Sequence, residues 1–405
     1  MSTERHVIVG AGHAARRAAQ TLRQRDPSAD IVMIGAEPHA PYDRPVLSKD
    51  ALMTDGGEQK AFVCAPDWYA ANGIDLRLAT TVESIDRARR EVRLHDGSTL
   101  AYDKLLLATG SRVRAFPGPV DERVPLYYVR TLADSLALRA ALAPGKRVAI
   151  FGGGFIGLEV AAAVTQAGCE ATVIEPAAEL LQRSLPRTAS RFVASLHAGR
   201  GVTLRLGETP QRIGYENGRA QIETDRGTIA ADLVVVGIGV LPNVELAREA
   251  GLEVNNGIIV DAQCRTSDPH VFAAGEVTMH VNPLLGRQVR IESWQVAENQ
   301  PVIAAANMLG DTQEYAEWPW LWSDQFDCNI QTLGMIDASH TLVERGDTQQ
   351  GPFCLFALDE AQRLRAVVAI NAGREMGAAK RLVASGKPLD PALLADVAVS
   401  LRSLL

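Results

Sequence analysis

The chain has 405 residues, which is more than one ordinary hydrophobic core accommodates, and a usual domain size of about 100–200 residues predicts two to four domains. A hydrophobic share of 47% and a charged share of 22% are typical of a globular enzyme and exclude a largely disordered chain. The net charge of −7 excludes general binding to nucleic acid or anionic lipid, which requires a concentrated basic surface.

The sequence also predicts the cellular compartment, the state of the cysteines and whether a metal is bound. No run of about 18 or more apolar residues occurs and no apolar leader precedes the first expected strand, so we expect a cytoplasmic protein without a signal peptide or membrane span. The five cysteines are too far apart to form a local C-x-x-C pair, zinc site or iron–sulfur ligand set: Cys64, Cys169, Cys264, Cys328 and Cys354. The eight histidines show no metal-binding spacing, and we expect them at the surface or as helix caps. We therefore predict reduced thiols and no metal.

The first predicted elements form a βαβ unit. Residues 6–26 are expected to form an apolar strand, a glycine turn and an alanine-rich helix, and residues 31–37 a second strand. The turn has the pattern G-x-G-x-x-A, formed by Gly10, Gly12 and Ala15. Such a turn directs backbone amides and a helix N-terminus at a pyrophosphate, and Glu37 at the end of the second strand suits an adenosine ribose. These features together predict a dinucleotide site.

The same pattern recurs at residues 146–176, which predicts an internal repeat of a domain. Its glycine turn contains Gly152, Gly154 and Gly157. Glu175 ends the following strand, and because an acid there repels a 2′-phosphate, NADH is favoured over NADPH. Arg183 either touches the pyrophosphate or is solvated. Periodicity leaves open whether the two folds hold two nicotinamides, two FADs or one of each.

The remaining segments complete three expected domains. Residues 77–110 and 203–239 are each predicted to form several strands. The last strand of each segment is apolar and leads to a glycine-containing turn. From about Trp318 the sequence becomes Trp-rich and β-like, and helices are expected from Gly373 to Leu405. This last part is predicted to be an α+β domain.

Several motifs together carry a family resemblance. They are PYDRPVLSK at 41–49, LLLATGS at 105–111, FGGGFIGLEVA at 151–161, VVVGIGVLPN at 234–243, HVFAAGEV at 270–277, ESWQVAENQ at 292–300 and PWLWSDQ at 319–325. This set resembles the two-dinucleotide flavoprotein reductases. The YDRP-x-LSK and PWLWSDQ motifs more closely resemble the ferredoxin reductase components of bacterial aromatic-ring dioxygenase systems and the similar putidaredoxin and rubredoxin reductases. The likeness extends from about residue 5 to residue 400.

The resemblance implies an α/β fold with two Rossmann-like dinucleotide-binding domains of the glutathione-reductase type and a C-terminal α+β domain. A discontinuous FAD-binding domain would comprise 1–111 and 241–317, an NAD-binding domain 112–240, and an interface domain 318–405. The implied FAD-binding residues are Gly10, Gly12, Ala15, Glu37, Arg44, Lys49, Val82, Thr109, Gly110, Arg130, Gly275, Glu276, Val277, Trp294 and Trp322. The implied NAD-binding residues are Gly152, Gly154, Ile156, Gly157, Glu159, Glu175, Arg183 and Gly239.

Two of these residues carry the implied catalytic roles. Lys49 would lie near the flavin, where its charge balances negative charge on the reduced ring. Glu159 would lie beside the nicotinamide and pair with Lys49, although a glutamate near a helix start also complements the helix dipole. Relatives have an aspartate where this chain has Glu276, and the longer side chain changes the geometry of that flavin contact.

The predicted function is electron transfer from NADH through FAD to a [2Fe–2S] ferredoxin of the Rieske type or of the plant or putidaredoxin type, by a monomer or homodimer. FAD suits this role because it accepts a hydride and releases electrons singly. One alternative is a reductase that serves a monooxygenase through rubredoxin or putidaredoxin, and another is a redox-controlled NADH-binding flavoprotein resembling apoptosis-inducing factor. A third is a disulfide reductase, but that class needs a reactive cysteine, and this chain has none beside its LSK motif. We predict that an acidic ferredoxin docks near Arg44 and some of the C-terminal basic residues Arg363, Arg365, Arg374, Lys380, Arg381, Lys387 and Arg402.

Overall fold

The computed structural model describes residues 4–405, which divide by their internal contacts into two compact units. Unit 1 comprises the chain up to Pro45 together with Gln59–Arg112 and Val240–Pro319, and unit 2 comprises Val46–Glu58, Val113–Gly239 and Trp320–Leu405. The regions predicted to bind NAD and to form the C-terminal domain thus share unit 2, and the division into three domains stays a prediction. None of the helices within residues 4–405 has the length and apolar character needed to cross a membrane.

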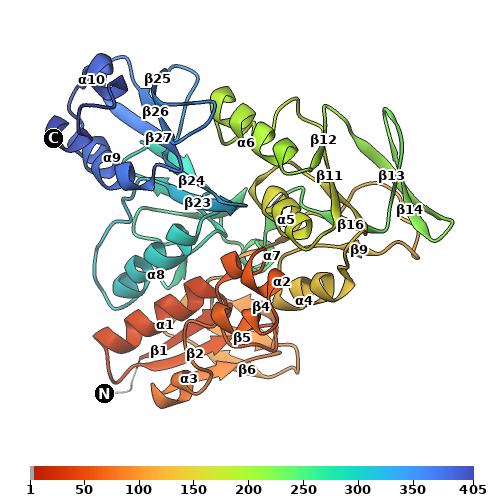
Figure 1. Ribbon diagram of the computed structural model, residues 1–405. Coiled ribbons are helices and arrows are strands. Elements are labelled where there is room, and N and C mark those ends of the chain that lie inside the picture. Colours follow the sequence, from red (N-terminus) through yellow and green to blue (C-terminus); the bar gives the residue numbers. More distant parts are fainter. Residues whose placement is uncertain (1–3) are drawn as a thin grey trace. The chain divides into compact units, whose positions relative to one another are not determined.

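Unit 1 is built on a five-stranded parallel sheet in the order β20-β7-β1-β2-β3. Its strands are β1 (Arg5–Val9), β2 (Asp30–Ile34), β3 (Ile74–Arg77), β7 (Lys104–Leu107) and β20 (Val271–Ala273). They are short apolar runs because a parallel sheet is usually covered on both faces. Helices α1 (His13–Arg25) and α8 (Trp294–Met308) lie side by side and contact each other extensively (Figure 1). Buried alanines on both helices permit this close approach.

Smaller elements complete unit 1. An antiparallel sheet contains β4 (Val82–Asp86), β5 (Glu91–Leu94) and β6 (Thr99–Ala101), and a four-stranded sheet contains β18 (Val254–Asn255), β19 (Gly257–Val260), β21 (Thr278–Asn282) and β22 (Arg287–Val289). Strand β8 (Ser111–Val113) pairs with β17 (Val240–Pro242). The short helices are α3 (Trp68–Ala71) and α7 (Glu245–Glu249), and 3-10 turns occur where the chain passes from one unit to the other, at Arg44–Val46 and Gly57–Ala61.

Unit 2 repeats the parallel architecture in the order β12-β11-β10-β16-β9. The strands are β9 (Leu126–Tyr127), β10 (Arg147–Phe151), β11 (Glu170–Glu175), β12 (Thr203–Leu206) and β16 (Leu233–Val236). Helices α4 (Leu132–Ala141), α5 (Phe155–Gln166) and α6 (Arg187–Gly199) accompany them, as does an antiparallel sheet of β13 (Pro210–Glu216), β14 (Arg219–Thr224) and β15 (Gly227–Ala231). Helix α2 (Asp50–Met53) packs on α4, and Arg139 of α4 donates hydrogen bonds to the carbonyl groups of Ala51 and Thr54.

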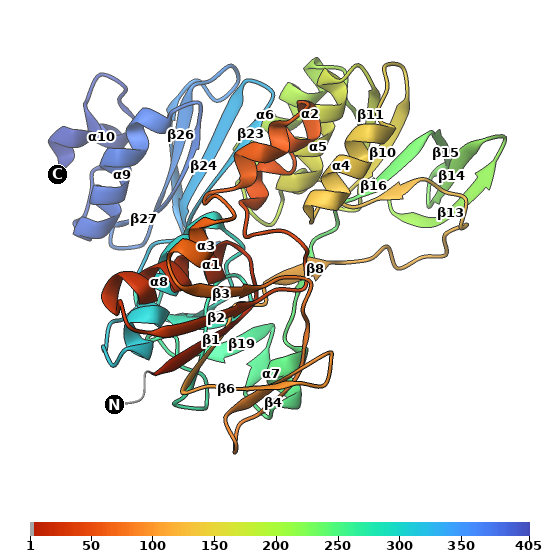
Figure 2. The ribbon, with the colours of Figure 1, turned by 90° about the horizontal axis from the view of Figure 1, so that it is seen from below.

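The C-terminal part of unit 2 is a five-stranded antiparallel sheet in the order β23-β24-β27-β26-β25. It contains β23 (Trp320–Gln325), β24 (Cys328–Gly334), β25 (Thr341–Gly346), β26 (Phe353–Leu358) and β27 (Leu364–Ile370). Helix α9 (Gly373–Ser385) packs on β24 and β27 (Figure 2), followed by α10 (Pro391–Ala395) and a 3-10 turn at Leu401–Leu404. The sheet shares one hydrophobic core with the parallel part of unit 2, where the Phe353 ring lies 5.4 Å from that of Phe192 in α6.

A packing prediction follows from the glycines around α5. A Cβ atom on Gly157 would lie 2.1 Å from the carbonyl oxygen of Gly152, whereas a Cβ on Gly154 has no atom within 4 Å. Because the first obstacle is backbone, we expect Gly157→Ala to lower the free energy of unfolding by about 1–3 kcal/mol. Gly154→Ala is the matched control, with an expected change within about 0.5 kcal/mol. Denaturant unfolding of both variants checks the prediction, and equal losses would contradict it.

Candidate functional site

The first glycine turn of unit 1 has the geometry that a pyrophosphate requires. Gly10 has a φ of +125°, and a Cβ there would lie 2.2 Å from the carbonyl oxygen of Ala108, the residue after the neighbouring strand β7. Gly12 is the N-cap of α1, and its position has open space around it. Glycine has no side chain to cap the helix, so the first amide groups of α1 remain available to an anion. Ala15 is fully buried and allows α1 to pack closely on the sheet.

Glu37, which follows β2 by three residues, is held by its neighbours. Glu37 accepts a hydrogen bond of 2.5 Å from the Tyr42 hydroxyl and forms an ion pair of 3.0 Å with Arg44. Arg44 therefore lies against the predicted ribose-binding carboxylate. Its predicted contact with the phosphates and the isoalloxazine stays a prediction.

A loop residue that the sequence analysis missed holds the predicted FAD residues after β7. Asn243 accepts a hydrogen bond of 2.8 Å from the Thr109 hydroxyl through its carbonyl oxygen and donates one of 2.9 Å to the Thr109 carbonyl. The Asn243 amide also donates to the Gly110 carbonyl at 3.0 Å. Asn243 is the last residue of the VVVGIGVLPN motif, so only that motif signalled it.

The segment containing Glu276 lies close to Ser111, the first residue of β8. Glu276 accepts a hydrogen bond of 3.0 Å from Ser111, and the Gly275 amide donates to Gln300 at 2.8 Å. The side chains of Val82 and Val277 are buried in the apolar core of unit 1. Contacts of these two valines with a cofactor would therefore come from backbone atoms.

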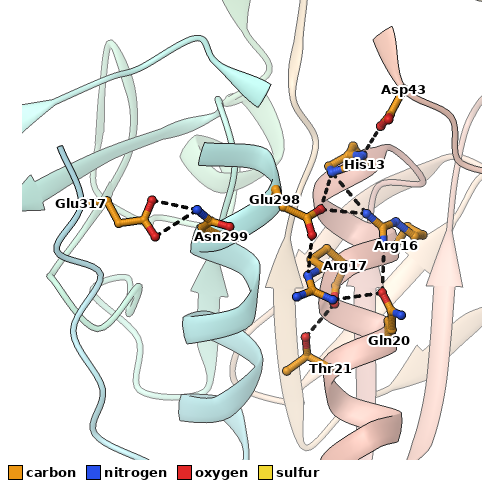
Figure 3. Close-up of polar contacts among 9 residues, drawn as sticks. All are labelled: His13, Arg16, Arg17, Gln20, Thr21, Asp43, Glu298, Asn299 and Glu317. Carbon is orange, nitrogen blue, oxygen red and sulfur yellow. Dashed lines mark hydrogen bonds and ion pairs between the residues drawn. The ribbon is translucent and has the colours of Figure 1, made fainter. Parts of the chain in front are cut away.

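A charged cluster joins α1 to α8 in unit 1 (Figure 3). The imidazole of His13 is only 8% exposed and contacts two carboxylates, Asp43 through Nδ1 and Glu298 through Nε2 at 2.6 Å. Glu298 also pairs with Arg16 and Arg17, each at 2.9 Å. Burial by itself would lower the pKa of His13, but the hydrogen bonds to Asp43 and Glu298 outweigh it and raise that pKa above its ordinary value. The Trp294 ring lies 5.1 Å from the His13 ring.

The expectation of surface or capping histidines is therefore wrong at several positions. His13 is nearly enclosed, and His6, His197 and His280 are buried. Burial lowers the pKa of His280 to about 4. Single histidines carry no periodic signal, and their partners are distant in sequence, so the sequence did not indicate burial.

The second glycine turn, in unit 2, repeats the geometry of the first. Gly152 has a φ of +107°, and a Cβ there would lie 2.4 Å from the Gly237 carbonyl oxygen. Gly154 is the N-cap of α5 and has open space around it. Glu175 accepts hydrogen bonds from the amides of Gly153 at 2.6 Å and Ala177 at 2.8 Å. These bonds fix the acid beside the turn, and its role in selecting NADH stays a prediction.

The other predicted nucleotide residues of unit 2 occupy varied positions. Ile156, in the first turn of α5, is 47% exposed although it is apolar, which suits a residue that a ligand covers. Gly239 has open space around it, and Arg183 is exposed between β11 and α6. Arg130 precedes α4, where its amide donates to Asp134.

The predicted Lys49 and Glu159 pair forms within unit 2. Lys49 Nζ lies 3.7 Å from a Glu159 oxygen and closer, at 2.9 Å, to Asp324. The Glu159 carboxylate is 6% exposed and accepts hydrogen bonds from the hydroxyls of Ser48 and Ser323. Burial raises the pKa of Glu159 above its ordinary value, although Lys49 and the two hydroxyls oppose this shift. A buried, doubly hydrogen-bonded carboxylate is more than a surface complement to a helix dipole.

Aromatic rings extend from this pair along β23. The Trp320 and Trp322 rings stack 5.1 Å apart, with an angle of 25° between their planes. Lys49 lies over the Trp322 ring at 5.9 Å, and Lys380 of α9 lies over the Trp320 ring at 4.3 Å. Each end of the stack therefore contacts a cation.

The cysteines do not suit thiol chemistry. All five are free, and all except Cys64 are buried. Burial raises the pKa of Cys328 to about 11 and that of Cys354 to about 12, which disfavours the reactive thiolate. The structure therefore argues against the disulfide-reductase alternative.

The two glycine turns, each with an acid after the next strand, define an oxidoreductase with two dinucleotide-binding folds. A family model described as pyridine nucleotide-disulphide oxidoreductase matches residues 4–300, and one described as reductase C-terminal matches residues 320–405. The chain belongs to the pyridine nucleotide-disulphide oxidoreductase family.

Individual relatives agree with this assignment. The ferredoxin–NAD(+) reductase component of the anthranilate 1,2-dioxygenase system of Burkholderia cepacia is 61% identical over 406 residues, covering 100% of both chains. Putidaredoxin reductase of Pseudomonas putida is 36% identical over 408 residues, covering 98% of this chain and 96% of the relative. The reductase in the crystal structure of the covalent putidaredoxin reductase–putidaredoxin complex has a TM-score of 0.95 at 34% identity, covering 100% of this chain and 98% of that one. The predicted family, fold class and enzyme class are confirmed.

The His13 cluster generates a pH prediction. Because the folded-state pKa of His13 is raised, its protonation stabilises the fold fully below the unfolded-state pKa of about 6.5, and this contribution is lost as pH rises through the folded-state pKa. We expect His13→Gln to lower the free energy of unfolding of unit 1 at pH 6 by about 1–3 kcal/mol, and by less at pH 9. Thermal denaturation across this range checks it, with exposed His95→Gln as control. A pH-independent difference between wild type and His13→Gln would contradict the prediction.

Proposed function

We propose that this chain is the NADH-dependent flavoprotein reductase of an aromatic-ring dioxygenase system, passing electrons from NADH through FAD to a [2Fe–2S] ferredoxin. The observation that carries the proposal is the 61% identity, covering 100% of both chains, to the reductase component of an anthranilate dioxygenase system. The ferredoxin of an anthranilate-type system is therefore the first acceptor to test. We place the protein in the cytoplasm.

The residues of each unit fit the cofactor assigned to it. In unit 1, the open helix N-terminus after Gly10 and Gly12 would hold the FAD pyrophosphate, and Glu37 the adenosine ribose. In unit 2, the α5 N-terminus at Gly154 would hold the NADH pyrophosphate, with Glu175 disfavouring a 2′-phosphate. When bound, FAD supplies the step from two-electron to one-electron chemistry. The protein contributes binding, orientation and charge.

Lys49 and Glu159 would serve the nicotinamide reaction. Their ion pair lies within unit 2 and holds the ammonium and carboxylate groups 3.7 Å apart. The charge of Lys49 is shared between Glu159 and Asp324, which fixes the position of its ammonium group.

Anaerobic titration with NADH tests the proposed function. We expect the purified protein to be yellow and its flavin to be bleached by about one equivalent of NADH per flavin. The reduced protein should then reduce an added [2Fe–2S] ferredoxin fast enough to support steady-state turnover. A colourless protein that FAD cannot reconstitute would refute the proposal. Slow bleaching with a long-lived NAD complex would favour the redox-controlled binding protein, and faster reduction of a rubredoxin or putidaredoxin would favour a monooxygenase partner.

The partner surface is proposed on helix α9. Among the C-terminal basic residues, Arg363 is neutralised by Asp359 at 2.9 Å, and Lys387 donates to the Leu405 carbonyl. Arg374, Lys380 and Arg381 are exposed on α9. This helix therefore supplies the positive charge that an acidic ferredoxin would meet.

Neutralising one α9 cation should weaken ferredoxin docking selectively. We expect Arg381→Gln, at an exposed position of α9, to raise the KM for ferredoxin about three- to tenfold at low ionic strength, with flavin reduction by NADH unchanged. Arg363→Gln is the matched control, because its charge is already paired. Steady-state kinetics at two salt concentrations measure the effect, which should diminish at high salt. An Arg381 variant with wild-type KM at low salt would argue against docking at α9.

A further inference from the structure

The carboxylate of Glu159 has closer partners than Lys49. The Ser48 hydroxyl donates to Oε2 at 2.5 Å, and the Ser323 hydroxyl donates to Oε1 at 2.6 Å, so each oxygen receives its own hydrogen bond. Lys49 is more distant, at 3.7 Å. Burying a carboxylate is costly unless hydrogen bonds replace its water, and here two serines provide them.

One of these serines is held in turn by a buried chain. Gln325 Nε2 donates to Ser323 Oγ at 3.1 Å, and Gln325 Oε1 lies 2.9 Å from His197 Nε2 in α6. Ser323, Gln325 and His197 are all fully buried. Burial lowers the pKa of His197, so the ring is neutral at pH 7, and its Nε2–H donates to the Gln325 oxygen. The chain fixes the direction in which the Ser323 hydroxyl points.

Strand β23 thereby sets both members of the catalytic pair. Ser323 and Asp324 are consecutive, and side chains alternate between the two faces of a strand. Ser323 contacts Glu159, whereas Asp324 contacts Lys49. A single strand of the C-terminal sheet therefore holds the acid through one residue and the cation through the next.

We propose that Ser48 and Ser323 are positioning residues that orient Glu159 for the reaction with NADH, with Gln325 and His197 holding Ser323. The inference rests on the proposed function and deepens it. Through Ser323, the C-terminal segment completes the nicotinamide site in addition to offering a surface to the partner.

Rapid mixing of the holoenzyme with NADH provides the first test. Ser323→Ala should lower the limiting rate of flavin reduction by about tenfold, the effect of losing one hydrogen bond to a charged group. Ser323→Thr keeps a hydroxyl and should restore most of the rate. Ser190→Ala is the matched control, since Ser190 is a buried serine of unit 2 whose hydroxyl has no hydrogen-bond partner among the described residues.

Two further readouts separate positioning from mere stability. Loss of a hydroxyl that donates to the ionised carboxylate should raise the pKa of Glu159 further, so the acid limb of the pH–rate profile moves to higher pH. Calorimetric binding of NAD⁺ to the oxidised holoenzyme reports on the site without turnover and should weaken in Ser323→Ala. If that variant does not fold, Ser48→Ala removes the donor to the other oxygen.

The outcomes distinguish this inference from the proposed function. A wild-type enzyme that reacts with NADH, together with serine-to-alanine variants of unchanged rate, pH profile and NAD⁺ affinity, would overturn the positioning role alone. If NADH does not reduce the flavin of the wild-type enzyme, the proposed function is overturned and this inference with it. A rate loss that threonine does not rescue and that leaves the pH profile unmoved would assign Ser323 to packing and reject positioning.

Discussion

Close backbone contact without an intervening Cβ atom is the constraint on which both nucleotide sites depend. At Gly10 the chain passes against the Ala108 carbonyl, and at Gly152 it passes against the Gly237 carbonyl. Any larger residue would force strand and turn apart. Because the turns are so tight, α1 and α5 begin shortly after the central strands β1 and β10, with their first amide groups free for an anion. Glu37 and Glu175, at or just after the ends of the next strands, can serve a nucleotide only because the turns are placed in this way.

The parts of the structure that recur along the sequence were predictable. Strand, glycine turn, small-residue helix and terminal acid are local signals, and their repetition identified both parallel sheets. The pairing of Lys49 with Glu159 was expected from the family resemblance, and it lies within unit 2. The roles assigned to the individual cofactor-binding residues remain predictions.

The polar partners of these residues were not predictable. His13 meets Glu298 across 285 positions, and Ser323 meets Glu159 across 164. Such contacts depend on how helices and strands pack, and a single histidine or serine carries no periodicity. Asn243 is similar, because its double contact with Thr109 spans 134 residues. Tertiary packing alone created these contacts.

The two units stabilise a partly buried and a buried carboxylate in opposite ways. Burial would raise the pKa of Glu298, but the His13 hydrogen bond and the nearby arginines outweigh it and lower that pKa. Glu159 is surrounded by neutral hydroxyls and one more distant lysine, and burial prevails. The first arrangement locks a negative charge in place, whereas the second leaves a carboxyl group whose proton affinity responds to its neighbours.

The hydrophobic core that the C-terminal sheet shares with the parallel part of unit 2 limits how such a reductase can change its redox partner in evolution. Grafting residues 320–405 from another reductase would have to preserve the inner face, where Phe353 meets Phe192 and Ser323 reaches Glu159. The outer side of α9 is not constrained by this packing, since Arg374 and Arg381 are exposed. If the partner docks on α9 as proposed, a new partner preference can arise by point substitution on that helix, whereas exchange of the whole segment would also disturb the proposed positioning of Glu159.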